Sequence, residues 1–118
     1  MEMTKLKRSR CAVLHLVLKR KWYDMIERGE KREEYRDETP YWYTRILNWY
    51  NKWDSKGVHG KVVSFSRGYR KPTMHFKASF ILPYIVGMER PNPLHPEWGE
   101  PSTPHYVIKL FKRIELED

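Results

Sequence analysis

Four segments of the chain have the apolar patterns of β-strands. Residues 12–18 form a continuous apolar run broken only by His15, and a run of this length predicts a strand buried on both faces. Residues 61–66, 74–82 and 106–111 alternate instead, as strands do when one face is turned toward a core. Together these segments predict a sheet that supplies most of the core.

Residues 19–28 have the spacing of an amphipathic helix. Trp22, Met25 and Ile26 stand at positions i, i+3 and i+4, which places them on one helical face. Gly29 follows at the position where a residue in the left-handed conformation commonly ends a helix. We therefore predict a helix that packs on the sheet through this face and ends before Gly29.

A second helix is predicted to begin at Thr39 and Pro40, because threonine is a favoured N-cap and proline is favoured at the first helical position. Its apolar residues fall on one stripe: Trp42, Ile46, Trp49, Tyr50 and Trp53. We interpret this stripe as core packing, with a platform for stacking bases as the alternative.

The segment between the two helices, residues 31–36, alternates in a polar way and predicts a short strand with functional or solvated faces. The predicted order is therefore strand, helix, short strand, helix, two strands, long loop, strand. Because strands outnumber helices and several are hairpin neighbours, this order favours an α+β fold. We expect a small, mostly antiparallel β-barrel with two or three flanking helices.

The chain of 118 residues fits one domain. We expect residues 1–11 to be a basic mobile tail and residues 12–118 to be the domain. The segment 83–104 holds six of the eight prolines, so it is predicted to be a loop, and its Trp98 would pack it over the barrel. Cys11 is the only cysteine, and no apolar stretch is long enough to cross a membrane, so we expect a cytoplasmic protein without a disulfide.

The net charge of +8 is concentrated in two parts of the chain. Residues 1–36 hold 11 Lys and Arg against 6 Asp and Glu, and residues 54–82 hold 6 against 1. Two basic blocks around a neutral middle favour a polyanionic partner, and nucleic acid is the common one.

One short segment carries candidate chemistry. On a strand, Glu34 and Arg36 point to the same face, and Lys31, just before it, can fold over that face. A carboxylate between two cations stays ionised and fixes the orientation of the arginine, so the trio could clamp a phosphate or a base edge. An ordinary solvated run of charges is the alternative, because Arg32, Glu33 and Asp37 are charged as well.

The spacing Gly29-x-Lys31-x-x-Glu34-x-Arg36, after a strand and an amphipathic helix, resembles the signature of the activating signal cointegrator homology (ASCH) family. Softer matches are Leu16-x-Leu18-Lys19, Phe65-Ser66-Arg67-Gly68-Tyr69 and Glu97-Trp98-Gly99, so that the resemblance covers about residues 12–113. It implies a PUA-like barrel and a role in RNA-related processes.

The resemblance also implies an enzymatic alternative. Some small bacterial ASCH proteins are amidohydrolases that remove the acyl group of N(4)-acetylcytidine, and others are reported as ribonucleases. In such an enzyme Lys31 would be the reactive lysine, with Glu34 as acid, base or orienting group. The amidohydrolase branch carries Thr where Glu34 stands here and needs a further downstream glutamate. The candidates by location are Glu89, Glu97 and Glu100.

We therefore expect an RNA- or nucleotide-binding protein with a cationic cleft, with the hydrolase or a protein-interaction module as alternatives. The residues expected to bind the ligand are Lys31, Glu34, Arg36, Lys19, Ser66, Arg67, Tyr69 and Trp98. Tyr69 stands in a basic turn where it could stack on a base, or else pack back on the protein. The five histidines have no metal-ligand spacing, so neither a metal nor a cofactor is expected.

Overall fold

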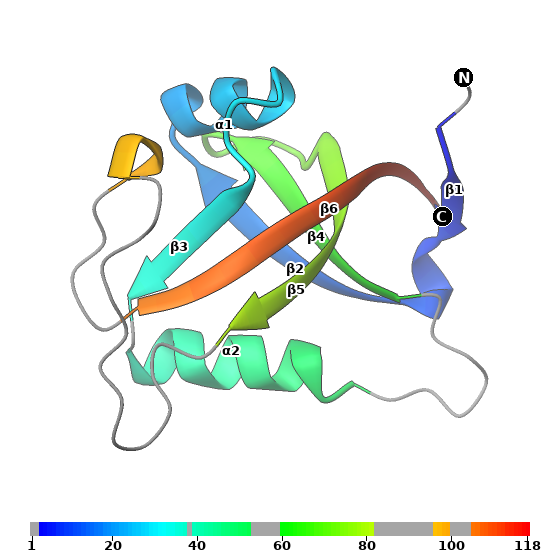
Figure 1. The fold of residues 1–118 in the computed structure, drawn as a ribbon. Coiled ribbons are helices and arrows are strands. Elements are labelled where there is room, and N and C mark those ends of the chain that lie inside the picture. Colours follow the sequence, from blue (N-terminus) through cyan, green and yellow to red (C-terminus); the bar gives the residue numbers. More distant parts are fainter. Residues whose placement is uncertain (1–2, 38, 53–59, 82–95, 100–104) are drawn as a thin grey trace.

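The computed structural model describes residues 3–37, 39–52, 60–81, 96–99 and 105–118 (Figure 1). The elements in chain order are β1 (Lys5–Lys7), η1 (Arg8–Arg10), β2 (Cys11–Leu18), α1 (Arg20–Glu27), β3 (Glu33–Asp37), α2 (Pro40–Tyr50), β4 (Gly60–Arg67), β5 (Met74–Ile81), η2 (Pro96–Trp98) and β6 (His105–Glu117). Here η marks a short 3₁₀ helix. No helix in the described part of the chain is long and apolar enough to cross a membrane.

The six strands form one curled, mixed sheet in the order β1-β6-β5-β4-β2, with β3 also paired to β6. Within the described residues, β3–β6, β4–β5 and β5–β6 are antiparallel, whereas β2–β4 and β1–β6 are parallel. Figure 1 shows α1 above and α2 below the curled strands. The α+β class, the curved sheet and the two helices predicted from the sequence are confirmed, and the sheet is a mixed half-barrel.

The half-barrel stays open between β2 and β3. Across the described residues β2 pairs only with β4, and β3 pairs only with β6. The two strands therefore face each other as the edges of the curl, without a ladder of hydrogen bonds between them. Edges of this kind leave backbone donors and acceptors that other groups must satisfy.

Because the sheet is curled, both helices pack against its inner face although they lie at opposite ends of the curl (Figure 1). Tyr23 and Ile26 of α1 and Ile46 and Trp49 of α2 join one buried cluster with the inward side chains of the strands. This arrangement explains why only the inner face of β2 is buried along the whole strand, where the sequence predicted burial on both faces; the outer face is buried only near Cys11. Ala12, Leu14, Leu16 and Leu18 line the core, but Val17 is 40% exposed because no helix covers the outer face there.

The ends of the helices follow the local chemistry of the sequence. Gly29 has φ of +79°, the left-handed conformation predicted for the residue after α1. At the start of α2, the Trp42 N–H donates to Thr39 Oγ1 over 3.2 Å, so threonine caps the helix as predicted. In the predicted stripe of α2, Ile46 and Trp49 are buried, Tyr50 is exposed, and Trp53 lies outside the described residues.

Part of the segment expected to be a basic tail belongs to the sheet. Lys5–Lys7 run parallel to Glu115–Glu117 at the end of β6. Leu6 packs on a small cluster with Cys11, Val62 and Ile114. One apolar residue between two lysines gives too short a pattern to predict a strand, so the charge dominated the sequence-based expectation.

The predicted loop 83–104 lies mostly outside the described residues. Only Pro96–Trp98, which form η2, and Gly99 can be placed. Trp98 is buried against Tyr35 and Val107, so this part of the loop is held on the sheet by its aromatic residue.

A candidate ligand pocket between β2 and β3

The candidate site begins with two buried residues of β3. The sequence predicted functional or solvated faces for this strand, and the solvated alternative does not hold for Glu34, which is 4% exposed, or for Tyr35, which is 6% exposed. Tyr35 packs on Trp98 of η2, on one side of the strand. Glu34 points to the other side, toward the open edge of β2, and a carboxylate buried there must find charged or hydrogen-bonding partners.

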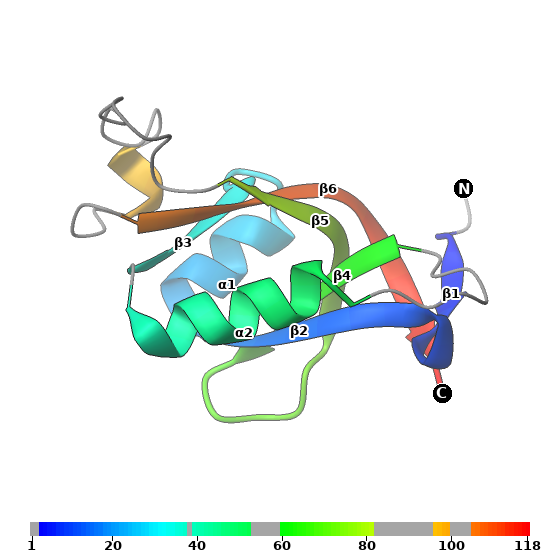
Figure 2. The same cartoon turned by 90° about the horizontal axis from the view of Figure 1, so that it is seen from below.

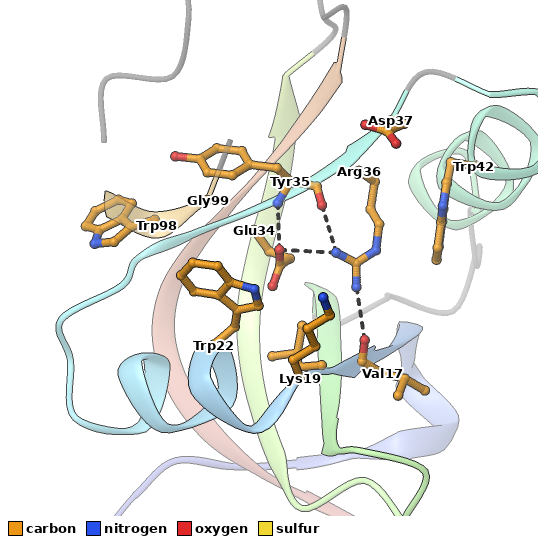
Figure 3. Close-up of a pocket in the computed structure, with 11 residues that line it drawn as sticks. Val17, Lys19, Trp22, Glu34, Tyr35, Arg36, Asp37, Trp42, Trp98 and Gly99 are labelled. Atoms are coloured by element: carbon orange, nitrogen blue, oxygen red, sulfur yellow. Dashed lines mark hydrogen bonds and ion pairs between the residues drawn. The ribbon is translucent and has the colours of Figure 1, made fainter. Parts of the chain in front are cut away.

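Glu34 finds those partners in the two cations that the sequence indicated. Its Oε1 lies 3.1 Å from Arg36 Nη1 and 3.5 Å from Lys31 Nζ, and it accepts a 2.9 Å hydrogen bond from the Tyr35 N–H. The predicted geometry, a carboxylate between two cations, is thus present. Figure 3 shows the contact of Glu34 with Arg36.

Arg36 bridges the open edges of the half-barrel. Its Nη1 donates to the Tyr35 carbonyl over 2.7 Å, and its Nη2 donates to the Val17 carbonyl of β2 over 3.3 Å (Figure 3). The guanidinium carbon lies 5.1 Å from the centre of the Trp42 ring, within the range of a cation–π contact. The guanidinium thus occupies the gap in which a further strand would close a barrel.

Lys31 is buried beneath this cluster, with 2% of its surface exposed. Its Nζ donates to the Trp98 carbonyl over 2.5 Å and lies 4.5 Å and 5.3 Å from the ring centres of Trp22 and Tyr35. Burial lowers the pKa of Lys31, and the neighbouring Glu34 carboxylate opposes that effect. Through its contacts with the Trp98 carbonyl and the Glu34 carboxylate, Lys31 links η2 to β3.

A pocket of about 570 Å³ opens above the cluster, in the gap between β2 and β3. Its aromatic lining comes from four different elements: Trp22, Tyr35, Trp42 and Trp98. Its polar lining includes Glu34, Arg36 and Lys19, whose side chain extends toward the carboxylate in Figure 3. This volume falls within the range of about 300–1,000 Å³ that is typical of small-molecule sites.

One atom of the lining lacks a partner. The Glu34 side chain is only 5% exposed, and its Oε2 atom is buried. Among the described residues, Oε2 has no hydrogen-bond partner. A buried charged oxygen without a partner costs free energy that a ligand could recover. Because Glu34 is a lining residue, this acceptor lies in the polar wall of the pocket.

The structure brings together five of the eight residues predicted to bind a ligand: Lys19, Lys31, Glu34, Arg36 and Trp98. The other three lie apart from the pocket. Ser66 is fully buried and its Oγ lies 2.6 Å from His15 Nε2, and Arg67 forms an ion pair of 2.9 Å with Asp24. Tyr69 is 97% exposed in the turn between β4 and β5, so it does not pack back on the protein.

Sequence reasoning missed Trp22 and Tyr35 as lining residues, and it considered Trp42 only as part of the α2 stripe, with a base-stacking platform as the alternative to core packing. Trp22 was assigned to a core-facing helix surface, and Trp42 to the buried stripe of α2, because helical spacing alone cannot separate a core from a pocket wall. Both residues are only half-buried. The available signal was their position in the first turn of each helix, next to a strand end.

Comparisons with known proteins do not identify the chain. No protein-family model matches it, and neither the curated proteins nor the solved structures contain a match. Membership of the ASCH family therefore stays a prediction from the signature residues. In the described part of the chain, no group of three His, Cys, Asp or Glu residues could hold a metal ion.

Proposed function

We propose that this protein binds a nucleic-acid-derived ligand and that one nucleobase enters the pocket between β2 and β3. The observation that carries the proposal is the unpartnered Glu34 Oε2, buried in a pocket with three tryptophans in its lining. A nucleobase has a flat face for aromatic or guanidinium stacking and N–H groups at its edge for a carboxylate.

The cationic residues at the start of α1 suit the phosphate of a nucleotide. Lys19 lines the pocket, and the adjacent Arg20 and Lys21 are exposed at the start of α1. The guanidinium of Arg36 donates hydrogen bonds to the Tyr35 and Val17 carbonyls. These bonds fix the plane of the guanidinium. The lysines supply mobile charges for phosphates, and the arginine supplies a stacking surface.

Tyr69 supports the same proposal from outside the pocket. The turn that carries it projects from the body of the molecule (Figure 2), and the exposed Arg70 and Lys71 follow Tyr69 directly. The Gly68 N–H donates to the Leu18 carbonyl over 2.8 Å, which joins the start of the turn to the end of β2. An almost fully exposed aromatic between cations is suited to contact RNA.

The resemblance to the ASCH family agrees with this proposal. Three of its four signature residues, Lys31, Glu34 and Arg36, form the ionic cluster below the pocket. A PUA-like relationship would also associate the fold with RNA. The proposal is therefore an RNA- or nucleotide-binding protein of ASCH type.

The hydrolase alternative has less support from the geometry. A lowered pKa favours Lys31 as a nucleophile. However, its Nζ donates to the Trp98 carbonyl, lies over the Trp22 and Tyr35 rings, and is not part of the pocket lining. These contacts fit a lysine that positions the pocket wall. An acylated cytidine panel tests the alternative, because deacylation by the wild type that is lost in Lys31→Ala would establish it.

The substitution Glu34→Gln tests the proposed function. The glutamine keeps the shape of the side chain and can still accept from the Tyr35 N–H, but its amide N–H₂ would face the ligand donor. We expect calorimetric titration with the four ribonucleoside 5′-monophosphates to detect binding to the wild type and at least a tenfold weaker affinity in the variant. This loss corresponds to about 1.4 kcal/mol.

The matched control is Glu30→Gln, which removes a charge from an exposed carboxylate paired with Arg28. It is expected to leave the affinity unchanged. Equal affinities for wild type, Glu34→Gln and Glu30→Gln would contradict a role for the Glu34 carboxylate. Absence of binding by the wild type to every nucleotide and to short RNA would overturn the proposed function.

A further inference from the structure

Tyr41 is an exposed aromatic residue next to the pocket that no feature of the core requires. Its side chain is 58% exposed, in the first turn of α2. Its ring meets the ring of Trp42 edge to face, with 5.0 Å between the centroids and an angle of 84°. Trp42 lines the pocket, so Tyr41 continues the aromatic wall of the pocket onto the outer surface.

Arg45 holds this exposed ring in place. Its guanidinium carbon lies 4.7 Å from the centre of the Tyr41 ring, one helical turn further along α2. The contact supplies a positive charge beside the ring. The helix contains no aspartate or glutamate, so no acidic residue of α2 offsets that charge.

We propose that Tyr41 and Arg45, here the Tyr41–Arg45 surface, bind the nucleotide adjacent to the one in the pocket, so that the ligand is a single-stranded polynucleotide and not a free nucleotide. The inference rests on the proposed function of the pocket. A neighbouring base in a strand lies one sugar-phosphate unit away, and Tyr41 is in direct contact with a wall of the pocket.

The chemistry of the surface favours a polynucleotide over a protein partner. Stacking of a base on an aromatic ring tolerates any sequence, and an adjacent arginine can contact the backbone phosphate at the same time. The whole chain carries a net charge of +8, which attracts a polyanion. The exposed Tyr69 turn, which is joined to the end of β2 at Leu18, offers a second aromatic and cationic contact elsewhere on the surface.

The test compares single nucleotides with short strands. Ribonucleoside 5′-monophosphates and homopolymeric ribohexanucleotides of the same bases are titrated against wild type, Tyr41→Ala and Tyr41→Phe. We expect Tyr41→Ala to weaken hexanucleotide binding about tenfold, as for the loss of one base stack, and to leave monophosphate binding unchanged. Tyr41→Phe keeps the ring and is expected to bind like the wild type.

Tyr43→Ala is the matched control. Tyr43 is 52% exposed on the same helix but lies about 200° further around its axis, so its removal should change neither affinity. The inference is overturned if Tyr41→Ala binds hexanucleotides like the wild type, or if Tyr41→Ala and Tyr43→Ala weaken them equally. Tight monophosphate binding without any gain for hexanucleotides would also overturn it, while the proposed function of the pocket would stand. If the wild type binds neither probe, both proposals fail.

Discussion

At the scale of single residues, Lys31 and Lys21 offer a matched comparison, because the ammonium groups of both lie over the ring of Trp22. The distances to the ring centre are 4.5 Å for Lys31 and 4.6 Å for Lys21. Lys31 is buried with Glu34 and the Trp98 carbonyl, whereas Lys21 is exposed. Differences between their substitutions therefore report on burial and pairing and not on the cation–π contact alone.

We expect Lys31→Met to lower the free energy of unfolding by about 3 kcal/mol, the lower end of the usual cost of breaking a buried ion pair. The cost is at the lower end because Glu34 keeps Arg36 as an ionic partner. Lys21→Met is expected to change it by less than about 0.5 kcal/mol. Urea denaturation measures both values. A cost for Lys31→Met no larger than that for Lys21→Met would show that the buried lysine does not hold the pocket wall.

The lowered pKa of Lys31 also predicts how the stability difference between the wild type and Lys31→Met depends on pH. In the unfolded chain the pKa of a lysine is about 10.4, and in the folded protein the pKa of Lys31 is lower. Between these two pKa values the unfolded state therefore binds more protons than the folded state. Stability from Lys31 therefore rises with pH across this window. The difference in unfolding free energy between wild type and Lys31→Met should widen from neutral pH toward pH ~10. A difference that narrows would mean that Glu34 outweighs burial.

At the scale of elements, the first turn of α2 links helix capping to the pocket, because the N–H that Thr39 caps belongs to Trp42. We expect Thr39→Ala to lower the unfolding free energy by about 1 kcal/mol, the usual cost of losing an N-cap, and Thr39→Ser to preserve it. Thr44→Ala on the exposed side of the same helix should be neutral or slightly stabilising, since alanine is the better helix former. Thermal or urea denaturation that ranks the two alanine variants equally would contradict the capping role.

Local sequence signals predicted the elements well where the chemistry is local. The cap at Thr39 and the left-handed Gly29 depend on neighbouring residues only, and both are present. Burial was harder to predict. The β3 segment was expected to have functional or solvated faces, and its charge pattern did not reveal that Glu34 is buried. The ionic partners of Glu34, Lys31 and Arg36, are local, but Arg36 also donates to the Val17 carbonyl of β2 across the gap, a contact that no short pattern predicts.

At the scale of the whole molecule, the pocket is a consequence of topology. The parallel pairing of β2 with β4 and the antiparallel pairing of β3 with β6 leave β2 and β3 as facing edges. Neither pairing is encoded in a short pattern, so the sequence predicted a small barrel but not the edge at which it stays open or which strands pair in parallel. The trio of Lys31, Glu34 and Arg36 was predictable because it is local, whereas its aromatic surroundings come from α1, α2 and η2.

The central claim, that nucleotides bind between β2 and β3, can be tested through the indole N–H signals of the tryptophans. Trp22, Trp42 and Trp98 line the pocket, whereas Trp49 is buried and its Nε1 donates to the carbonyls of Ala12 and Val62, at 2.9 Å and 3.2 Å. Trp49 is therefore an internal control in the same spectrum.

The decisive measurement is a titration of ¹⁵N-labelled protein with the four ribonucleoside 5′-monophosphates, with each indole signal assigned by a Trp→Phe substitution. We predict that the signals of Trp22, Trp42 and Trp98 shift together and saturate with one common affinity for at least one nucleotide, while Trp49 stays in place. Nucleotide binding that leaves these three signals unmoved, or no shift with any nucleotide, would contradict the account.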